Sequence, residues 1–352
     1  MPVVRLVMPV LALLCFGAAA CDGGTREGAA AAPTATPSAE AAAPTSSAAP
    51  SGLATPPATS TSPPTLTLVA VGDVMPGRSL GWALESGGAP LLDEPIVAVL
   101  SGASLAVANL EAPVATGGEA QAKSYTFRAP PSAASALAGA GFDVVGLANN
   151  HILDFGPDAL AETTRLLREA GVAHAGAGVD RAAALEPAIV ERGGVRIAFV
   201  SLVDVPAEGS FSRSAWEAGP NTPGVAWADE RTVAEAVVAA RASAAIVVAL
   251  LHFGNEFHAA PSESQRTLAR LAIDAGAALV VGTHPHVLQE VEEYHGGLIA
   301  YSLGNFLFDG FDGLVEDSAI LRVTFTGPLL TGWDLLTVRI DPTGRPHLST
   351  GD

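Results

Sequence analysis

The sequence predicts an α/β fold, in which buried strands alternate with amphipathic helices. Apolar runs of strand length recur along the chain, and helical patterns separate several of them. In addition, each of five runs ends in Asp, Glu, Asn or His. Because ligands of open α/β sheets bind at the carboxyl ends of the strands, we expect these five endings to converge on one rim.

The five strands share one pattern, a β-branched or aliphatic run followed by side chains that can bind a metal. In chain order the strands and the polar residues after them are Leu66–Val71 with Asp73, Leu105–Ala108 with Asn109 and Glu111, Asp143–Ala148 with Asn150 and His151, Ala245–Leu251 with His252, and Ala278–Thr283 with His284 and His286.

Three helices are predicted from apolar periodicity, over Pro157–Ala170, Asp229–Ala242 and Ser262–Ala275. The last two begin with Asp or Ser at a plausible N-cap and have Glu soon after.

The C-terminal part is predicted to add strands at Leu298–Ser302, Ala319–Phe325 and Trp333–Ile340, separated by Gly and Pro turns. We expect these strands to complete a second sheet. Between them, Leu303–Phe308 is expected to be an apolar loop with a turn at Gly304-Asn305.

Composition excludes some classes of function. The 352 residues hold 18 Lys+Arg and 36 Asp+Glu, a formal net charge of −18. No basic stripe could neutralise phosphates, so nucleic acid is not an expected partner. Both cysteines precede residue 22, which excludes a thiolate zinc site in the folded part, expected over residues 65–352.

The N-terminal residues 1–21 have the features of a signal peptide. Arg5 gives a positive start, Leu6–Phe16 an apolar run, and Gly17–Ala20 a small-residue approach to Cys21. The ending is similar to a bacterial lipobox, in which Cys21 is lipidated; an ordinary cleaved signal is the alternative. Both predict an exported protein, and the first anchors it to the cell membrane, facing outside the cytoplasm.

Residues 22–64 are almost entirely Ala, Pro, Thr, Ser and Gly. Repeated prolines prevent helix propagation, so this segment is expected to be a disordered linker.

The strand endings offer imidazole, carboxylate and amide oxygen ligands without thiolate. Such a set suits Zn²⁺, Mn²⁺ or Fe²⁺. Six residues exceed the needs of one ion and predict a two-metal centre that activates water; they are Asp73, Glu111, Asn150, His252, His284 and His286. Pro285 between the last two histidines is expected to keep this pair extended.

Several motifs together resemble the CapA-type capsule synthesis family, associated with poly-γ-glutamate production. In order they are Val71–Met75, Asn109–Glu111, Ala148–His151 with Asp154 and Gly156, His252–Glu256, Gly282–His286 and Tyr301–Phe306. The family is similar in turn to calcineurin-like metallophosphoesterases, and the resemblance therefore implies a four-layer α/β/β/α sandwich.

The resemblance also implies roles for individual residues. Asp73 and His286 would hold one ion, Glu111 would bridge, and Asn150, His252 and His284 would hold the second. His151 would protonate a leaving oxygen. One departure matters: Met75 stands where those phosphoesterases have a histidine ligand.

Further residues are candidates for supporting roles. Arg78 is expected either to pair with an anionic substrate oxygen or to be a solvated helix residue. Asp154 and Glu256 would fix a histidine tautomer, with Glu256 as a general base the alternative. Asn109 and Asn305 would line the substrate pocket or satisfy loop backbone groups.

The resulting hypothesis is an exported metal-dependent enzyme that acts on a phosphoester or γ-glutamyl bond. Its substrate would be anionic or γ-glutamyl, although a net charge of −18 repels a polyanion unless metal ions or a local basic pocket offset it. The alternative is a non-catalytic, membrane-anchored scaffold among the membrane subunits of a capsule synthase, which Met75 favours.

Overall fold

The computed structural model describes residues 63–87, 90–310 and 315–349. The predicted signal peptide, Cys21 and almost all of the predicted linker lie outside these residues. No helix of the described part is both long and apolar enough to cross a membrane.

The described chain forms two large sheets and one small one. In spatial order the eight-stranded sheet contains β16 (Pro346–Leu348), β15 (Leu329–Ile340), β14 (Asp317–Thr326), β1 (Thr65–Val74), β2 (Leu105–Leu110), β3 (Val144–Gly146) and β4 (Ala173–Ala175), with β13 (Asn305–Leu307) beside β1. The six-stranded sheet contains β11 (Val291–Tyr294), β12 (Gly297–Ala300), β10 (Leu279–Thr283), β9 (Ile246–Phe253), β7 (Val195–Asp204) and β6 (Ala188–Arg192). The small sheet pairs β5 (Ala177–Gly178) with β8 (Gly224–Val225).

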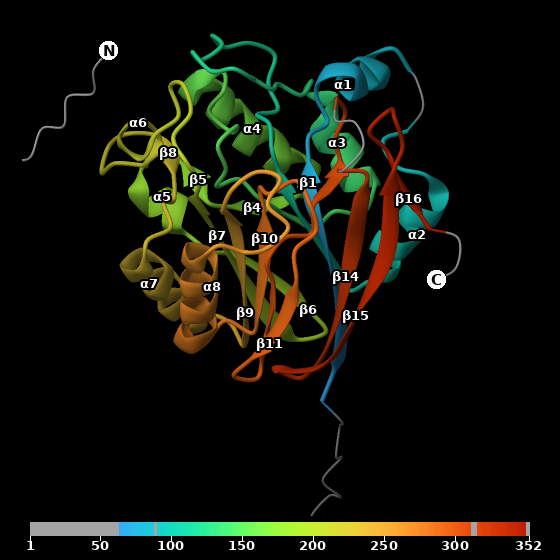
Figure 1. Ribbon diagram of the computed structural model, residues 1–352, viewed down its shortest axis with the longest axis vertical. Helices are drawn as coiled ribbons and strands as arrows, with labels where there is room; N and C mark the ends of the chain where they lie inside the picture. The colour runs from blue at the N-terminus through green and yellow to red at the C-terminus, as the bar shows by residue number, and fades with distance from the viewer. Residues whose placement is uncertain (1–62, 88–89, 311–314, 350–352) are drawn as a thin grey trace, which may run out of the picture. The chain divides into compact units, whose positions relative to one another are not determined.

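Helices connect the strands and cover the outer faces of both large sheets. They are α1 (Arg78–Glu85), α2 (Glu94–Gly102), α3 (Ser132–Gly139), α4 (Gly156–Ala170), α5 (Arg181–Leu185), α6 (Arg213–Trp216), α7 (Glu230–Arg241) and α8 (Glu263–Ala275). Figure 1 shows α7 and α8 on one side of the sheets and α2 and α3 on the other.

The three predicted helices are confirmed as α4, α7 and α8, each within a residue or so of its expected bounds. The N-caps have a direct physical basis. Asp229 accepts a hydrogen bond from the Thr232 amide, and Ser262 and Gln265 form a capping box that satisfies two otherwise unpaired backbone donors.

Three hydrophobic cores define four layers. Along β1, Val69 and Val71 pack into a core with α2, α3 and α4, whereas Leu68 and Ala70, which alternate with them, belong to the core that separates the sheets. Strand β9 alternates likewise: Val248 joins the core between the sheets. The residues directly before and after Val248 pack against α7 and α8. Alternation is the expected consequence of the two-residue period of a strand. The α/β/β/α sandwich is thus confirmed.

The strand predicted at Leu298–Ser302 is confirmed as β12, which lies in the six-stranded sheet, but two other expectations for the C-terminal part are wrong. Strands β14 and β15 do not complete a second sheet: β14 pairs antiparallel with β1, and β15 pairs with β14. The predicted loop at 303–308 contains β13, which runs parallel to β1 with Asn305 opposite Asp73. Both differences come from pairing over more than two hundred residues, which a local pattern does not encode.

Candidate metal centre

The five predicted strand endings do converge, and they come from both large sheets. Strands β1, β2 and β3 are parallel neighbours in the first sheet, and β9 and β10 are parallel neighbours in the second. Their carboxyl ends meet, so that the Nε2 atom of His252 lies 2.8 Å from Oδ1 of Asn150.

Glu111 is at the centre of this cluster. It follows β2, is fully buried, and its Oε1 atom lies 3.8 Å from Nε2 of His252 and 4.0 Å from Nε2 of His286. Within the described residues, neither of its carboxylate oxygens has a hydrogen-bond partner, and neither has Nδ1 of buried His284. Buried polar atoms are normally paired, so these atoms fit the ligands of a cation.

Two groups of side chains have ligand atoms close enough to hold an ion. One is Asp73, Glu111 and His252, the other is Glu111, His284 and His286, and within each group the ligand atoms lie within 4.8 Å of one another. Glu111 belongs to both, as expected of a bridging carboxylate. The histidines are divided between the groups differently from the division that the resemblance implies, although Nδ1 of His286 also lies 3.5 Å from Oδ2 of Asp73.

Burial and neighbouring charge separate the pKa values of the two central carboxyls. Burial and the nearby Asp73 raise the pKa of Glu111 well above its ordinary value. Burial alone would also raise the pKa of Asp73, but hydrogen bonding and the charge of His286 bring it below the ordinary value. Loss of solvation lowers the pKa of His252 and His284, which leaves their imidazoles neutral and able to bind a metal.

The histidine pair after β10 is not extended, which corrects the expectation drawn from Pro285. His284 and His286 have φ angles of 94° and 59°. This backbone region is unusual for a side chain with a Cβ atom. The bend brings both imidazoles to the same cluster, with ring centroids 5.9 Å apart. Strain at such positions is typical of sites where function requires a fixed geometry.

Two asparagines hold candidate ligands in place. Nδ2 of Asn109 donates to Oδ1 of Asp73 at 2.8 Å, and Oδ1 of Asn305 lies 2.8 Å from Nδ1 of His286. They are 6% and 1% exposed, which puts them behind the ligands. Such contacts orient a ligand and fix its tautomer.

His151 and Asp154 form a buried pair beside the cluster. Nδ1 of His151 lies 2.6 Å from Oδ2 of Asp154, and Nε2 of His151 lies 4.0 Å from Oε1 of Glu111. The arrangement agrees with the expectation that Asp154 fixes a histidine tautomer. Burial lowers the pKa of His151, although Asp154 opposes this effect.

Lys123 is the site residue that sequence reasoning missed. Its side chain is fully buried, and Nζ donates to Oδ1 of Asp154 at 2.8 Å and to the carbonyl oxygen of Asn150. The rings of Phe211 and Trp216 lie 6.0 and 5.2 Å from this ammonium. One signal was present: Lys123 is the only lysine of the chain, whose other seventeen basic residues are arginines.

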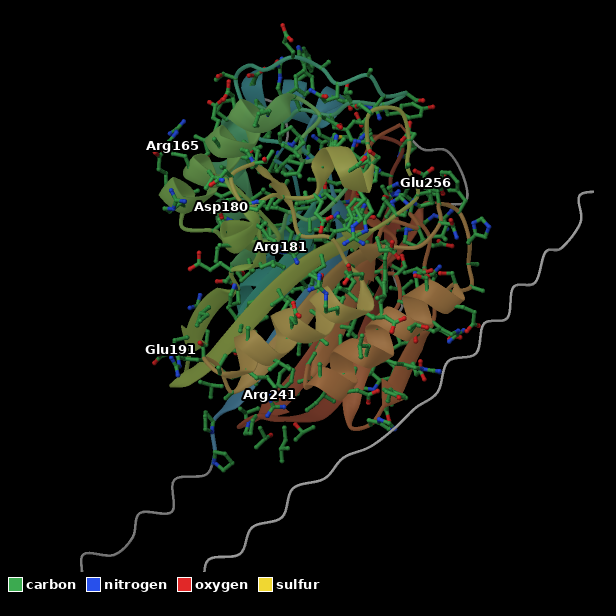
Figure 2. The ribbon with its side chains drawn as sticks, turned by 90° about the vertical axis from the view of Figure 1, so that its left-hand side faces the viewer. Arg165, Asp180, Arg181, Glu191, Arg241 and Glu256 are labelled. Carbon is green, nitrogen blue, oxygen red and sulfur yellow. The ribbon has the colours of Figure 1, made fainter. Side chains whose placement is uncertain are left out.

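Two cavities flank the cluster. One of about 390 Å³ has His151 and His286 in its wall, and the other, of about 340 Å³, has Asn150 and His284. Glu256 lines both. Figure 2 shows Glu256 near the carboxyl ends of the strands, whereas Arg241, which precedes β9, is at the other end.

Arg78 lines the larger cavity from the start of α1. Its Nε atom lies 3.2 Å from Oδ1 of Asp309, and its side chain is 40% exposed. Arg78 is therefore neither a fully solvated residue nor an unpaired cation, and its guanidinium also lies 5.7 Å from the ring of Phe127.

The fold and the site define a class of protein: a four-layer α/β sandwich with a buried cluster of histidines and carboxylates suited to divalent cations. Comparison with known proteins identifies the family. Residues 67–310 match the model of the bacterial capsule synthesis protein family PGA_cap, and the chain belongs to this family.

Curated relatives carry related names. The chain is 32% identical to the PGA biosynthesis protein CapA of Bacillus subtilis over 72% of its length, and 30% identical to the capsule biosynthesis protein CapA of Bacillus anthracis over 73%. It is 33% identical over 62% to a protein of Mycobacterium tuberculosis named "Probable polyglutamine synthesis accessory protein". The chain spans 66%, 63% and 61% of the lengths of these three relatives, less than two thirds of each.

Proposed function

We propose that this protein is a metal-dependent enzyme of capsule or poly-γ-glutamate production, which hydrolyses or transfers at a phosphoester or γ-glutamyl bond. Membership of the capsule synthesis family supports a role in capsule or poly-γ-glutamate production. One observation carries the chemistry: the two carboxylate oxygens of buried Glu111, which have no hydrogen-bond partner among the described residues, lie among the imidazoles of His252, His284 and His286, beside two cavities.

The residues present fit divalent cations. Asp73, Glu111 and His252 would hold one ion, and Glu111, His284 and His286 the other. Bound there, the ions would supply a nucleophilic water at neutral pH and stabilise negative charge on the substrate. Zn²⁺, Mn²⁺ and Fe²⁺ all suit this set of nitrogen and oxygen ligands.

His151 is the proposed proton donor to the leaving group. Asp154 binds Nδ1, so Nε2 is the atom that faces the candidate metal centre and exchanges a proton with the substrate. The ring of Phe127, 4.2 Å away between centroids, packs against the imidazole and limits its motion. An imidazole held at both its nitrogen and its face loses little entropy when it transfers the proton.

Export and anchoring are part of the proposal. A positive residue, an apolar run and small residues before Cys21 support a signal peptide, with lipidation of Cys21 as the anchor. This arrangement would put the enzyme on the outer side of the cell membrane, next to membrane subunits of a capsule synthase.

A non-catalytic scaffold is the second candidate, and Met75 favours it. Met75 is fully buried and accepts a hydrogen bond from the Gly77 amide through its sulfur at 3.3 Å. It packs in a small apolar cluster with Phe127 and Phe308. A thioether in place of an imidazole removes one ligand for the first ion, which weakens the case for two-metal catalysis and so favours a non-catalytic role.

Metal analysis and activity measurements separate the two candidates. The full chain, loaded with Mn²⁺, Zn²⁺ or Fe²⁺, is assayed on phosphodiesters and γ-glutamyl peptides beside His151→Ala and Glu111→Gln. We expect turnover that His151→Ala lowers by about 10²–10⁴-fold without loss of bound metal. Tight metal binding with no turnover on any substrate would instead support the scaffold.

A further inference from the structure

A third cavity has, among the described residues, two arginines in its wall and none of the candidate metal ligands. It has a volume of about 320 Å³, and its wall includes Arg78, Arg128 and Trp82. Arg78 also lines the 390 Å³ cavity that holds His151 and His286. Arg78 is therefore common to the walls of both cavities, and we call the 320 Å³ cavity the arginine groove.

Arg128 is available to bind an external anion. Within the described part of the chain it makes no ion pair with a carboxylate, although acidic residues outnumber basic ones by 36 to 18. Its guanidinium instead lies 4.4 Å from the ring centroid of Phe155. Stacking on an aromatic face fixes the plane of the guanidinium and leaves its N–H groups available for an external carboxylate.

The remaining walls of the arginine groove suit the hydrocarbon part of a chain. Trp82 is 71% exposed although it is a large aromatic residue, and Pro130 and Pro131 complete the wall. Its exposed ring offers apolar surface on which methylene groups can pack. Glu85 is the one acidic residue among those that line the groove.

The two cavities that flank the candidate metal centre have acidic side chains in their walls. Glu208 and Glu256 line both the 390 Å³ and the 340 Å³ cavities. Within the described part of the chain, the 340 Å³ cavity has no arginine in its wall, whereas the arginine groove has neither Glu208 nor Glu256, so charge favours a polyanion that extends from the 390 Å³ cavity toward Arg78 and Arg128.

We propose that the arginine groove is a binding subsite for a chain of carboxylates, and that this chain is a γ-linked glutamate polymer held across Arg78 and Arg128. Its methylene groups would pack on Trp82 while its carboxylates pair with the guanidiniums. The inference rests on the proposed function for the identity of the polymer and adds the place and direction of binding.

Binding can be tested without catalysis. The full chain is treated with chelator and titrated with γ-linked glutamate oligomers, and binding is followed by calorimetry and by tryptophan fluorescence. We expect the oligomers to bind, to bind more weakly as salt rises, and to lose about five-fold in affinity in Arg128→Ala.

The control variant is Arg168→Ala. Arg168 is also exposed and makes no ion pair among the described residues, but it lies on α4 and lines none of the three cavities. It should bind the oligomers like the wild type. Arg128→Gln, which removes the charge but keeps a polar side chain, should lose as much affinity as Arg128→Ala, and thermal unfolding of both variants separates a folding defect from a binding defect.

Three results would overturn the inference: equal affinity of the Arg128 and Arg168 variants, equal binding of oligomers whose carboxylates are amidated, or tighter binding of oligogalacturonate than of γ-linked glutamate. Failure of the proposed function looks different. Oligomer binding that depends on Arg128, without turnover in the metal-loaded protein, would retain the subsite and reject the enzyme. Turnover in the metal-loaded protein that is equal in the wild type and in Arg128→Ala would retain the enzyme and reject the subsite.

Discussion

The Nζ atom of Lys123 lies 2.8 Å from Oδ1 of Asp154, and neither side chain is exposed to solvent. Asp154 in turn binds His151, so the only lysine of the chain holds the carboxylate that orients the proposed proton donor. Lysine presents a compact charge, which suits a space closed by Phe211 and Trp216 better than the broad plane of arginine.

Lys123→Met should destabilise the protein by about 3–5 kcal/mol, because it leaves the Asp154 carboxylate buried without its cation. Chemical denaturation at pH 7 measures this. The double variant Lys123→Met with Asp154→Asn should recover part of the loss, since no buried charge remains. If Lys123→Met were as stable as the wild type, the Lys123–Asp154 pair would contribute nothing to the stability of the fold.

Glu111→Gln should make the metal-free protein more stable by about 1–2 kcal/mol, because a neutral amide replaces a buried carboxylate beside Asp73. With metal bound, the wild type should instead be more stable than Glu111→Gln. At a hundred times its Kd an ion stabilises the wild type by about 2.7 kcal/mol, and the variant should gain much less. Thermal unfolding in the presence of chelator, and again with Mn²⁺ or Zn²⁺, measures the stability difference between the two proteins without and with metal. Equal stabilisation of the two proteins by metal would mean that the ion binds elsewhere.

Gly72→Ala should prevent folding or cost more than about 3 kcal/mol, because the added Cβ would lie 1.8 Å from the carbonyl oxygen of Gly304. This close approach lets β13 pair with β1 and brings Asn305 opposite Asp73. Gly332→Ala in β15 is the control, because its Cβ meets nothing within 4 Å. Yield and thermal unfolding distinguish the two, and a folded Gly72→Ala protein with wild-type stability would contradict the packing argument.

Asp229→Asn should lower stability at neutral pH by about 0.5–1 kcal/mol and have no effect near pH 2. Burial alone would raise the pKa of Asp229, but the Thr232 amide and the Arg213 guanidinium bring it from 3.8 to about 2. Because the folded-state pKa is lowered, the contribution is present above pH 3.8 and is lost as the pH falls to about 2. Denaturation at several pH values measures this, with exposed Asp158→Asn as the control. A difference between wild type and Asp229→Asn that persists at pH 2 would contradict it.

The strand endings could be predicted because they depend on local pattern. A buried strand such as β9 is recognisable from its continuous aliphatic run, and His252 at its end stands out against that run. The helices were predictable for the same reason, since Ser262 caps α8 through atoms only three residues away. The residues of the candidate metal centre can therefore be predicted from the sequence, although their arrangement cannot.

The arrangement itself was decided by contacts between distant parts of the chain. Five endings come from two sheets, β14 and β15 join the first sheet rather than a second, and His284 and His286 bend against the preference of the intervening Pro285. The local periodicity of a sequence gives strands and their exposed ends, because these depend on neighbours a few residues away. The pairing of Lys123 with Asp154, the central place of Glu111 and the shared wall of the arginine groove depend on long-range packing, which only the tertiary structure reveals.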